Sequence, residues 1–212
     1  MSSHESHKTG SALAKMDTLA ARLVALATPI RFGIAHSPVE VEAVYRLRCR
    51  IVVEQGWAQS ETFPNEIERD AYDDRAVHVV AWDDAVLAAT SRLVLPIPGQ
   101  PLPTEETFGL VIGSGERVVD IGRVCVAPAY RGMDHRILWA LLGQTWIEIR
   151  ARGFTEACGI LTPSLARTYQ RWGLRVVILG TPLPFWGEKR LPVLIQPAES
   201  RYTLLTQTAD RF

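Results

Sequence analysis

Two apolar, β-rich runs that meet at a tight turn constrain the fold of this chain more than any other feature. Residues 77–82 and 86–95 are joined by a turn that contains Asp83-Asp84, a dipeptide typical of a hairpin turn. Residues 117–127 form a third long apolar run of the same kind. We therefore expect the sheet to begin with antiparallel strands.

The second half of the chain changes to helical periodicity. Apolar residues recur at helical spacing from Ile137 to Ile149, and Gly153 closes this segment. Strands and helices then alternate, which predicts an α/β (α+β) fold: a mixed sheet with helices on both faces. The expected strands are residues 31–35, 77–82, 86–95, 117–127, 157–161, 174–179 and 191–195. The expected helices are residues 17–27, 38–52, 137–149 and 164–172, the last with Ser164 as its N-cap.

The length of the chain fits a single domain. Its 212 residues are somewhat above the usual size of one domain, and we expect that domain over residues 31–197. Residues 1–30 are predicted to be a flexible lead with a short helix that Pro29 ends. Residues 198–212 are predicted to be a C-terminal tail.

Charge and composition exclude several classes of function. The formal net charge is zero with scattered Lys and Arg, so we expect no nucleic acid and no anionic lipid as partner. No apolar stretch reaches membrane-spanning length, and the polar start does not resemble a secretion signal, so we expect a cytoplasmic protein. The 3 cysteines and 5 histidines show no ligand spacing, so we expect no metal site and no disulfide.

A strand, a turn and a helix follow each other in the middle of the chain. The turn contains Arg131 and Gly132, and His135 and Arg136 open the helix. A helix N-terminus offers unpaired N–H groups and a favourable dipole to a phosphate. Together with Val126 at the end of the strand, these residues are the candidate site for the phosphopantetheine arm of coenzyme A or of an acyl carrier protein. An ordinary turn with surface arginines is the alternative.

Three carboxylates lie close together in one polar loop, and arginines lie on the elements around it. Arg92 and Arg123 interrupt apolar strand runs, where an unpaired charge is costly. Arginine forms bidentate pairs with carboxylates and keeps its charge. We therefore expect the loop to be pinned to the sheet as one wall of a cleft, with leftover capacity for a substrate ammonium or carboxylate, rather than a solvated acidic turn. The expected cluster comprises Arg48, Trp57, Glu68, Asp70, Asp73, Arg92 and Arg123.

The segment from Ser164 to Leu174 reads Ser-Leu-Ala-Arg-Thr-Tyr-Gln-Arg-Trp-Gly-Leu. It resembles the GNAT acyltransferase superfamily, in which a small residue, then Tyr, then Gly and an apolar residue recur at this spacing. The resemblance implies that Tyr169 protonates the leaving thiolate or donates a hydrogen bond to it. A tyrosine packed on an amphipathic helix is the alternative.

The order of the charged residues resembles two related families, the acyl-homoserine-lactone synthases and the long-chain N-acyl amino acid synthases. Those families carry an Arg before a Gly-Trp, a Glu-x-Asp-x-x-Asp, an Arg-Leu near a Pro, and an acid-x-x-Arg on the central strand. The matching segments here are Arg48 with Gly56-Trp57, Glu68 to Asp73, Arg92-Leu93 with Pro96, and Asp120 to Arg123. The resemblance covers about residues 45–197. It implies a GNAT-like, mostly antiparallel sheet and an N-acyltransferase that binds no cofactor.

The implied reaction moves a fatty acyl group from an acyl-carrier-protein or acyl-CoA thioester to the amine of an amino-acid-like acceptor. Backbone N–H groups of Val124, Cys125 and Val126 are expected to hold the thioester carbonyl, with Asp120 on the side of the amine. The Cys125 thiol itself is expected to be inert and buried, because no histidine lies near it in the sequence.

Several alternatives stay open. The glycine-rich turn of CoA-using GNAT enzymes is replaced here by Met-Asp-His-Arg at residues 133–136, which favours an acyl carrier protein as the donor. Other outcomes are a lactone-forming synthase that uses S-adenosylmethionine, acylation of a peptide amine (Lys, ornithine or N-terminus), and a non-catalytic domain that binds an acyl thioester or an amino acid. The aromatic residues Trp57, Trp82, Phe108, Phe185 and Trp186 are candidates for an acyl channel, although a plain core is their expected role.

Overall fold

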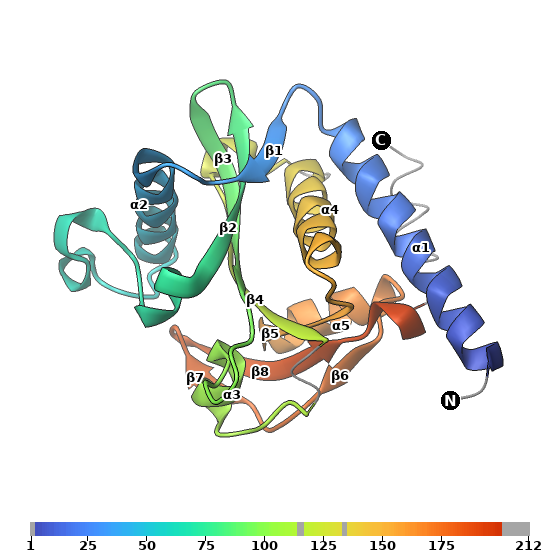
Figure 1. The fold of residues 1–212 in the computed structure, drawn as a ribbon. Coiled ribbons are helices and arrows are strands. Elements are labelled where there is room, and N and C mark those ends of the chain that lie inside the picture. Colours follow the sequence, from blue (N-terminus) through green and yellow to red (C-terminus); the bar gives the residue numbers. More distant parts are fainter. Residues whose placement is uncertain (1–2, 114–116, 133–134, 201–212) are drawn as a thin grey trace.

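The computed structural model describes residues 3–113, 117–132 and 135–200 (Figure 1). Most of the predicted tail, residues 198–212, lies outside the described residues. Within the described ranges, no helix has the length and hydropathy that a membrane span requires.

One mixed sheet of eight strands organises the molecule. Among the described residues, only the contact between β4 and β5 is parallel, and the other strand pairs are antiparallel. The path runs β1 (Arg31–Ile34), β2 (Ala76–Asp83), β3 (Val86–Val94), β4 (Val118–Val126), β5 (Glu156–Leu161), β8 (Glu188–Ile195) and β6 (Val176–Ile178), with β7 (Leu183–Phe185) paired to β8. This is the predicted mostly antiparallel sheet.

Helices cover both faces of this sheet, as the sequence predicts. In Figure 1, α2 lies on one face of strands β1 to β4, α4 lies on the other, and α1 packs outside α4. The helices are α1 (Ser3–Leu26), α2 (Pro38–Glu54), α3 (Pro103–Phe108), α4 (Arg136–Ala151) and α5 (Pro163–Arg171). Short 3-10 turns lie at Ser60–Thr62, Pro64–Glu66, Ala71–Arg75, Pro128–Tyr130 and Pro197–Glu199.

The alternation of side chains along β2 explains the two layers. Val79 and Ala81 pack into the core under α4, whereas Val80, between them, packs into the core under α2. Helix α2 begins at a capping box: the Ser37 hydroxyl accepts from the Glu40 N–H, and the Glu40 carboxylate accepts from the Ser37 N–H. The local sequence and the tertiary packing therefore agree in this half of the fold.

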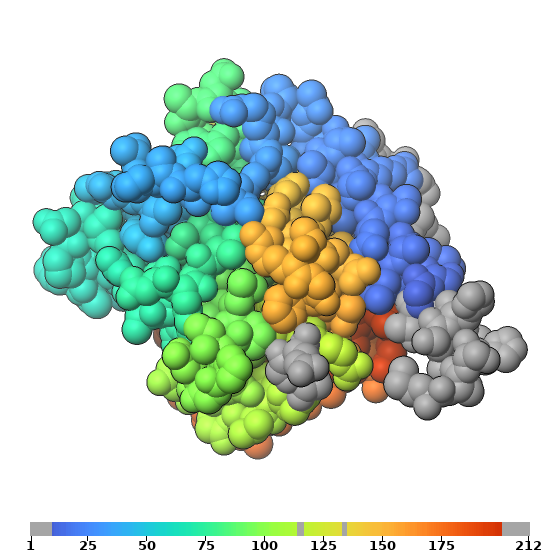
Figure 2. All heavy atoms as spheres, viewed as in Figure 1, coloured from blue at the N-terminus to red at the C-terminus, as the bar shows by residue number. Residues whose placement is uncertain are grey.

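Helix α1 is longer than the short helix predicted within residues 1–30. It begins at Ser3 and packs directly against α4, and Figure 2 shows the two helices side by side. A Cβ atom on Gly143 would lie 2.9 Å from the carbonyl oxygen of Ala20, so the contact needs a glycine at this place. Asp17 accepts a hydrogen bond from Trp146 Nε1 at 2.7 Å. Contact with α4 holds a helix whose polar start gives little sequence signal.

Three smaller features differ from the sequence prediction. Helix α3 and strand β7 were not predicted. The N-cap of α5 is Thr162, whose hydroxyl accepts from the Leu165 N–H at 3.2 Å, and not Ser164, which lies inside the helix. The cap moves because Pro163 occupies the first helical position, where its missing N–H is tolerated.

Strands β4 and β5 separate halfway along β4. Their pairing runs from Val118 to Ile121 on β4 and ends at Gly159 on β5. A Cβ atom on Gly159 would lie 2.7 Å from the Ile121 carbonyl oxygen, so the strands approach closely at this last pair. Beyond it, β4 continues to Val126 with β3 as its only strand partner among the described residues. This opening exposes one backbone edge of β4 in the middle of the sheet.

Candidate active site

The structure brings the acidic loop and the three arginines together. We call this group the ion-pair cluster: Arg48 of α2, Glu68, Asp70 and Asp73 of the loop, Arg92 of β3 and Arg123 of β4. It lies on the face of the sheet that α2 covers. Three cations and three carboxylates balance in charge, so the cluster itself carries no net charge.

Arg48 is the buried centre of the cluster, with 1% of its residue surface exposed. Its Nε donates to Glu68, and its two terminal nitrogens donate to both oxygens of Asp73 at 2.7 and 3.0 Å. Burial would raise the pKa of Asp73, but the hydrogen bonds and charge of Arg48, with the charge of Arg92, lower it to about 2. Asp73 therefore stays ionised and holds the loop to α2.

A β-bulge turns Arg123 toward the loop. Arg92 pairs with Gly122 and Thr90 pairs with Cys125, so two β4 residues lie opposite one β3 residue between these pairs. Arg123 adopts a φ of 52° there and donates to Glu68 and Asp70, each at 3.0 Å. A non-glycine residue at positive φ is uncommon. The strand distortion thus serves the ion-pair cluster, which lies beside the open edge of β4.

His78 lies buried against the ion-pair cluster. Its Nε2 is 3.9 Å from Asp73, its ring meets Tyr45 edge-on at 5.4 Å, and neither ring nitrogen has a hydrogen-bond partner among the described residues. Burial lowers its pKa from 6.5 to about 4, since the charge of Asp73 only partly offsets burial and the charges of Arg48 and Arg92 oppose protonation as well. His78 is therefore neutral in the folded protein at neutral pH.

This neutral histidine predicts a loss of stability in acid. Between pH 6.5 and about 4 the unfolded chain binds a proton at His78 that the folded chain does not. Acidification through this window therefore favours unfolding, by up to about 3 kcal/mol. Urea unfolding across the window should show a smaller loss for His78→Gln than for the wild type. His36→Gln, at an exposed histidine, is the control; an unchanged pH dependence in His78→Gln would contradict this account.

Asp120 lies next to the cluster rather than within it. Its carboxylate accepts from the Thr104 N–H at 2.8 Å and from the Cys158 thiol at 3.4 Å. Complete burial raises its pKa, while these hydrogen bonds and the charge of Arg92 act in the opposite direction. Asp120 is therefore a more basic carboxylate than Asp73.

Backbone amides line the open edge of β4. The Ala127 N–H donates to Ala88 of β3, so strand alternation directs the N–H group of Val126 away from β3, and Val124 lies in the β-bulge at the same edge. Arg131 Nε donates to the Val126 carbonyl at 2.9 Å, as this direction requires. The expectation that the Cys125 amide joins them is wrong, because the same alternation points it at β3. Burial raises the pKa of the Cys125 thiol to about 11, in keeping with an inert thiol.

The predicted phosphate site is only partly available. Both terminal nitrogens of Arg131 pair with Glu54, at 2.9 and 3.2 Å, and its Nε is bound to Val126. Arg131 therefore does not offer a free charge to a phosphate as predicted. Helix α4 begins at Arg136, after Gly132 and His135, and His135 occupies the N-cap at a φ of 54° without a side-chain cap. The helix N-terminus next to β4 is thus the remaining part of this predicted site.

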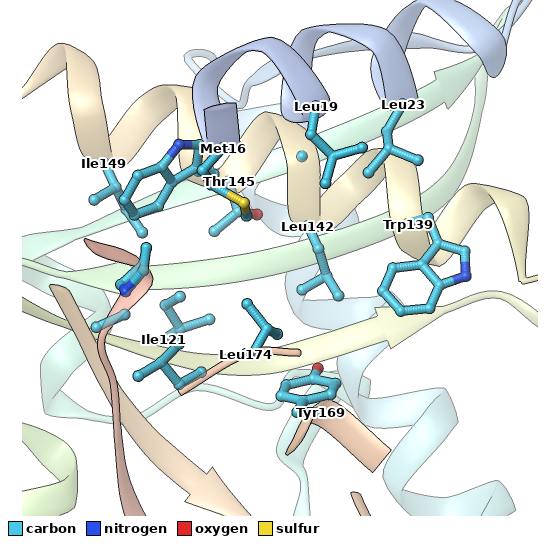
Figure 3. A pocket seen from close by; sticks show the side chains of 15 residues that line it. Met16, Leu19, Leu23, Ile121, Trp139, Leu142, Thr145, Ile149, Tyr169 and Leu174 are labelled. Carbon is cyan, nitrogen blue, oxygen red and sulfur yellow. The ribbon is translucent and has the colours of Figure 1, made fainter. Parts of the chain in front are cut away.

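Tyr169 lies on the opposite face of the sheet from the ion-pair cluster, in an apolar pocket under α4. The pocket is shown in Figure 3, with the Tyr169 hydroxyl directed into it. Burial raises the pKa of Tyr169 to about 12, so the hydroxyl keeps its proton at neutral pH. The lining residues are Met16, Leu19, Leu23, Ile121, Trp139, Leu142, Gly143, Thr145, Trp146, Ile149, Ala157, Tyr169, Leu174, Ile195 and Pro197.

The aromatic residues divide differently from the predicted acyl channel. Trp139 and Trp146 line the pocket, whereas Trp186 lies beside the ion-pair cluster and Trp57 lies beside Arg190. The guanidinium of Arg123 lies over the Trp186 ring at 5.1 Å. Trp57, predicted as a cluster member, instead donates from its Nε1 to Glu188 at 3.3 Å.

The sequence analysis missed Arg190 of β8. Its guanidinium lies 4.7 Å from the Trp57 ring, and its Nη2 lies 3.6 Å from Glu188. Its Nε and Nη2 are buried without a hydrogen-bond partner among the described residues. Burial and the neighbouring Arg123 lower its pKa. In the sequence it ends the charged run Glu188-Lys189-Arg190 at the start of β8, which gives no signal for a binding site.

The part of the chain that the structure describes contains no candidate metal site. No group of three or more His, Cys, Asp or Glu side chains is placed to hold an ion there. The site consists instead of an open strand edge, a buried charged cluster on one face of the sheet and an apolar pocket on the other.

This mixed sheet, opened between its parallel pair of strands, is GNAT-like. Residues 47–140 match the family described as the acetyltransferase (GNAT) domain, so this part of the chain carries that domain. No curated protein matches the sequence.

Solved structures of acyl-homoserine lactone synthases share this fold. The CoA-dependent enzyme MesI is 20% identical, with a TM-score of 0.67 over 85% of this chain and 94% of that one. The AHL synthase LasI is 17% identical, with a TM-score of 0.65 over 79% and 89% of the two chains. TofI, solved in a ternary complex with an inhibitor and MTA, is 23% identical, with a TM-score of 0.64 over 85% and 96%. At these identities the likeness shows the fold alone.

Proposed function

We propose that this acyltransferase moves a fatty acyl group from an acyl-carrier-protein or acyl-CoA thioester to the amine of an amino-acid-like acceptor. The observation that carries the proposal is the position of the open β4 edge. It lies between the charged cluster, which suits a polar acceptor, and the apolar pocket, which suits an acyl chain. A thioester carbonyl at this edge has one substrate environment on each face of the sheet.

The open edge supplies the electrophilic side of the reaction. The N–H group of Val126, which strand alternation directs away from β3, and that of Val124 in the β-bulge are the candidate donors to the thioester oxygen. Such preorganised donors stabilise the negative charge of a tetrahedral intermediate. Val124 is 38% exposed, which leaves room beside it for a substrate.

The acceptor is proposed to bind beside the ion-pair cluster. Asp70 is its most exposed carboxylate, with 33% of the side chain accessible, and is the candidate partner of the ammonium. The arginines that were predicted to bind a substrate carboxylate already donate hydrogen bonds to the carboxylates of the loop. Arg190, in contrast, has two buried nitrogens, Nε and Nη2, without a hydrogen-bond partner among the described residues. A carboxylate that accepts from both would satisfy them. An amino acid carries both complementary groups.

Proton balance assigns the remaining roles. The amine attacks in its neutral form, its nitrogen bonds to the carbonyl carbon, the C–S bond breaks, and the amine proton leaves while the thiolate gains one. Asp120, with its raised pKa, is the better proton acceptor of the site, and a water relay would connect it to the amine. Tyr169 is proposed to donate a hydrogen bond to the thiolate from the pocket side.

The likeness to lactone synthases makes S-adenosylmethionine the second acceptor to test. TofI was solved with MTA, and MesI is a CoA-dependent enzyme. Incubation of the protein with acyl-CoA or acyl carrier protein thioesters, and with amino acids, S-adenosylmethionine or a Lys peptide, resolves the acceptor by product mass. An N-acyl amino acid is the expected product. Binding of thioesters without turnover would indicate a non-catalytic domain and reject the proposal.

The same assay tests Tyr169. We expect Tyr169→Phe to lower kcat roughly ten- to a hundred-fold, the effect of one hydrogen bond to a charged group. A tyrosine whose pKa is about 12 holds its proton too tightly to be an effective acid toward a thiolate. Tyr130→Phe, which removes a hydroxyl bonded to Asp83, is the matched control and should leave kcat unchanged. Wild-type turnover in Tyr169→Phe would remove this residue from the mechanism.

A further inference from the structure

Helix α1 closes the apolar pocket on the side opposite β4. In Figure 3, Met16, Leu19 and Leu23 point into the pocket from α1, whereas Ile121 of β4 and Tyr169 lie across from them. An acyl chain that enters from the β4 edge therefore runs toward α1. The matched GNAT domain, residues 47–140, does not include this helix.

The pocket has the lining that a hydrocarbon chain requires. Its walls are aliphatic and aromatic, and none of the described lining residues carries a charge. The Thr145 hydroxyl is already bonded to Ser91 and to the Leu141 carbonyl, at 2.7 and 2.8 Å, so it makes no demand on a ligand. Apolar walls of this kind favour an apolar ligand and give no reason for a polar one.

Helix α1 is fixed in place and does not resemble a loose flap. Asp17 accepts hydrogen bonds from Trp146 at 2.7 Å and from Arg150 at 3.2 Å, both on α4. Ala20 packs on Gly143 too closely for any larger residue. A wall held by these contacts sets a fixed depth for the pocket.

The buried side chains of α1 fall into two groups. Leu13 and Ala20 belong to the main core under the sheet, whereas Leu19 and Leu23 form a separate cluster with Trp139 at the pocket. The same helix therefore carries one leucine that packs in the core, Leu13, and two that face the pocket, Leu19 and Leu23. This division separates a packing role from a ligand role.

We propose that α1 is the end wall of the acyl site and that Leu19 and Leu23 set the longest acyl chain that the enzyme accepts. The inference rests on the proposed acyl transfer and adds to it a specificity-determining segment outside the matched domain. The acyl chain occupies the space between Tyr169 and these two leucines.

Chain-length profiles test the end wall. The wild type, Leu19→Ala and Leu23→Ala would be compared on butanoyl, octanoyl, dodecanoyl and hexadecanoyl thioesters. We expect the ratio of kcat/KM for dodecanoyl over octanoyl donors to rise at least about tenfold in both variants, the scale of hydrophobic-pocket discrimination. Leu19→Phe, which fills the pocket, should shift the preference toward shorter chains. Unchanged ratios in all three variants would overturn the proposal.

Leu13→Ala is the matched control, because it removes the same atoms from the same helix at a core position. It should lose stability like the pocket variants but keep the wild-type chain-length profile. A profile that shifts equally in Leu13→Ala would assign the effect to general loosening of α1 and reject the end wall.

A binding measurement separates this inference from the proposed function. Trp139 and Trp146 line the pocket, so brominated fatty acids bound there should quench tryptophan fluorescence. Quenching that extends to longer acids in Leu19→Ala supports the end wall even if no thioester is turned over, in which case the proposed function alone fails. Turnover with an unshifted chain-length profile leaves the function standing and rejects the end wall.

Discussion

Arg48→Met should lower the free energy of unfolding by about 3–5 kcal/mol, the usual cost of removing one partner from a buried ion pair. Arg48 is almost fully buried and donates three hydrogen bonds to Glu68 and Asp73, whose side chains are only 3% and 0% exposed. Methionine keeps most of the side-chain volume but leaves both carboxylates short of a cation. Urea unfolding followed by circular dichroism measures the loss.

Arg46→Met provides the control on the same helix. Arg46 pairs with Glu42 and Glu66, but its side chain is 47% exposed, so its removal should cost at most about 1 kcal/mol. Both substitutions remove one positive charge from α2, so the difference between their unfolding free energies measures the effect of burial. A cost below about 1 kcal/mol for Arg48→Met would show that the acidic loop does not depend on α2.

The same ion pairs explain why the sequence predicted the cluster. Arg92 and Arg123 lie in strand runs that are otherwise apolar, and an unpaired charge at such a place would be too costly to keep. Three carboxylates within one short loop were the only concentrated supply of partners. The need to pair these charges predicted that the arginines and the loop carboxylates lie close together. It did not predict which arginine donates to which carboxylate. The β-bulge at Arg123 has no sequence signature that periodicity can detect.

Features that depend on contacts between distant segments were not predicted. Helix α1 starts with polar residues, and it is held by Asp17, Ala20 and their partners on α4. Helix α3 did have local signals, with Pro103 at its first position and Gly109 in the left-handed region at its end, yet no element was predicted there. The division of tryptophans between pocket and cluster follows from the packing of α4 and the β7–β8 hairpin.

The candidate site uses both faces of the sheet, one charged and one apolar. The outward alternation of β4 places Asp120 and Ile121 on opposite faces, one beside the charged side and the other in the apolar pocket. The opening between β4 and β5 is the passage between them. Acyl transfer needs a polar nucleophile and an apolar donor to meet at one carbonyl, and this geometry provides that meeting point.

Asp70→Asn should lower kcat/KM for the amine about a hundredfold while leaving KM for the thioester unchanged, the loss expected for one hydrogen bond between charged groups. Asp70 accepts from Arg92 at 2.6 Å and from Arg123 at 3.0 Å, and it is the cluster carboxylate that solvent reaches most easily. Asparagine can still accept from the Tyr72 N–H, which caps the following turn. Steady-state kinetics with each substrate varied in turn measures the split.

Asp74→Asn is the matched control, four residues along the same loop. Asp74 is 71% exposed and pairs only with Arg69 among the described residues, so its substitution should change neither kinetic constant. Thermal unfolding of both variants monitors the loop itself. If Asp70→Asn lowers stability but alters the constants for amine and thioester equally, Asp70 only positions the loop. If it raises KM for the amine alone in a fully folded enzyme, the exposed edge of the ion-pair cluster is where the acceptor binds.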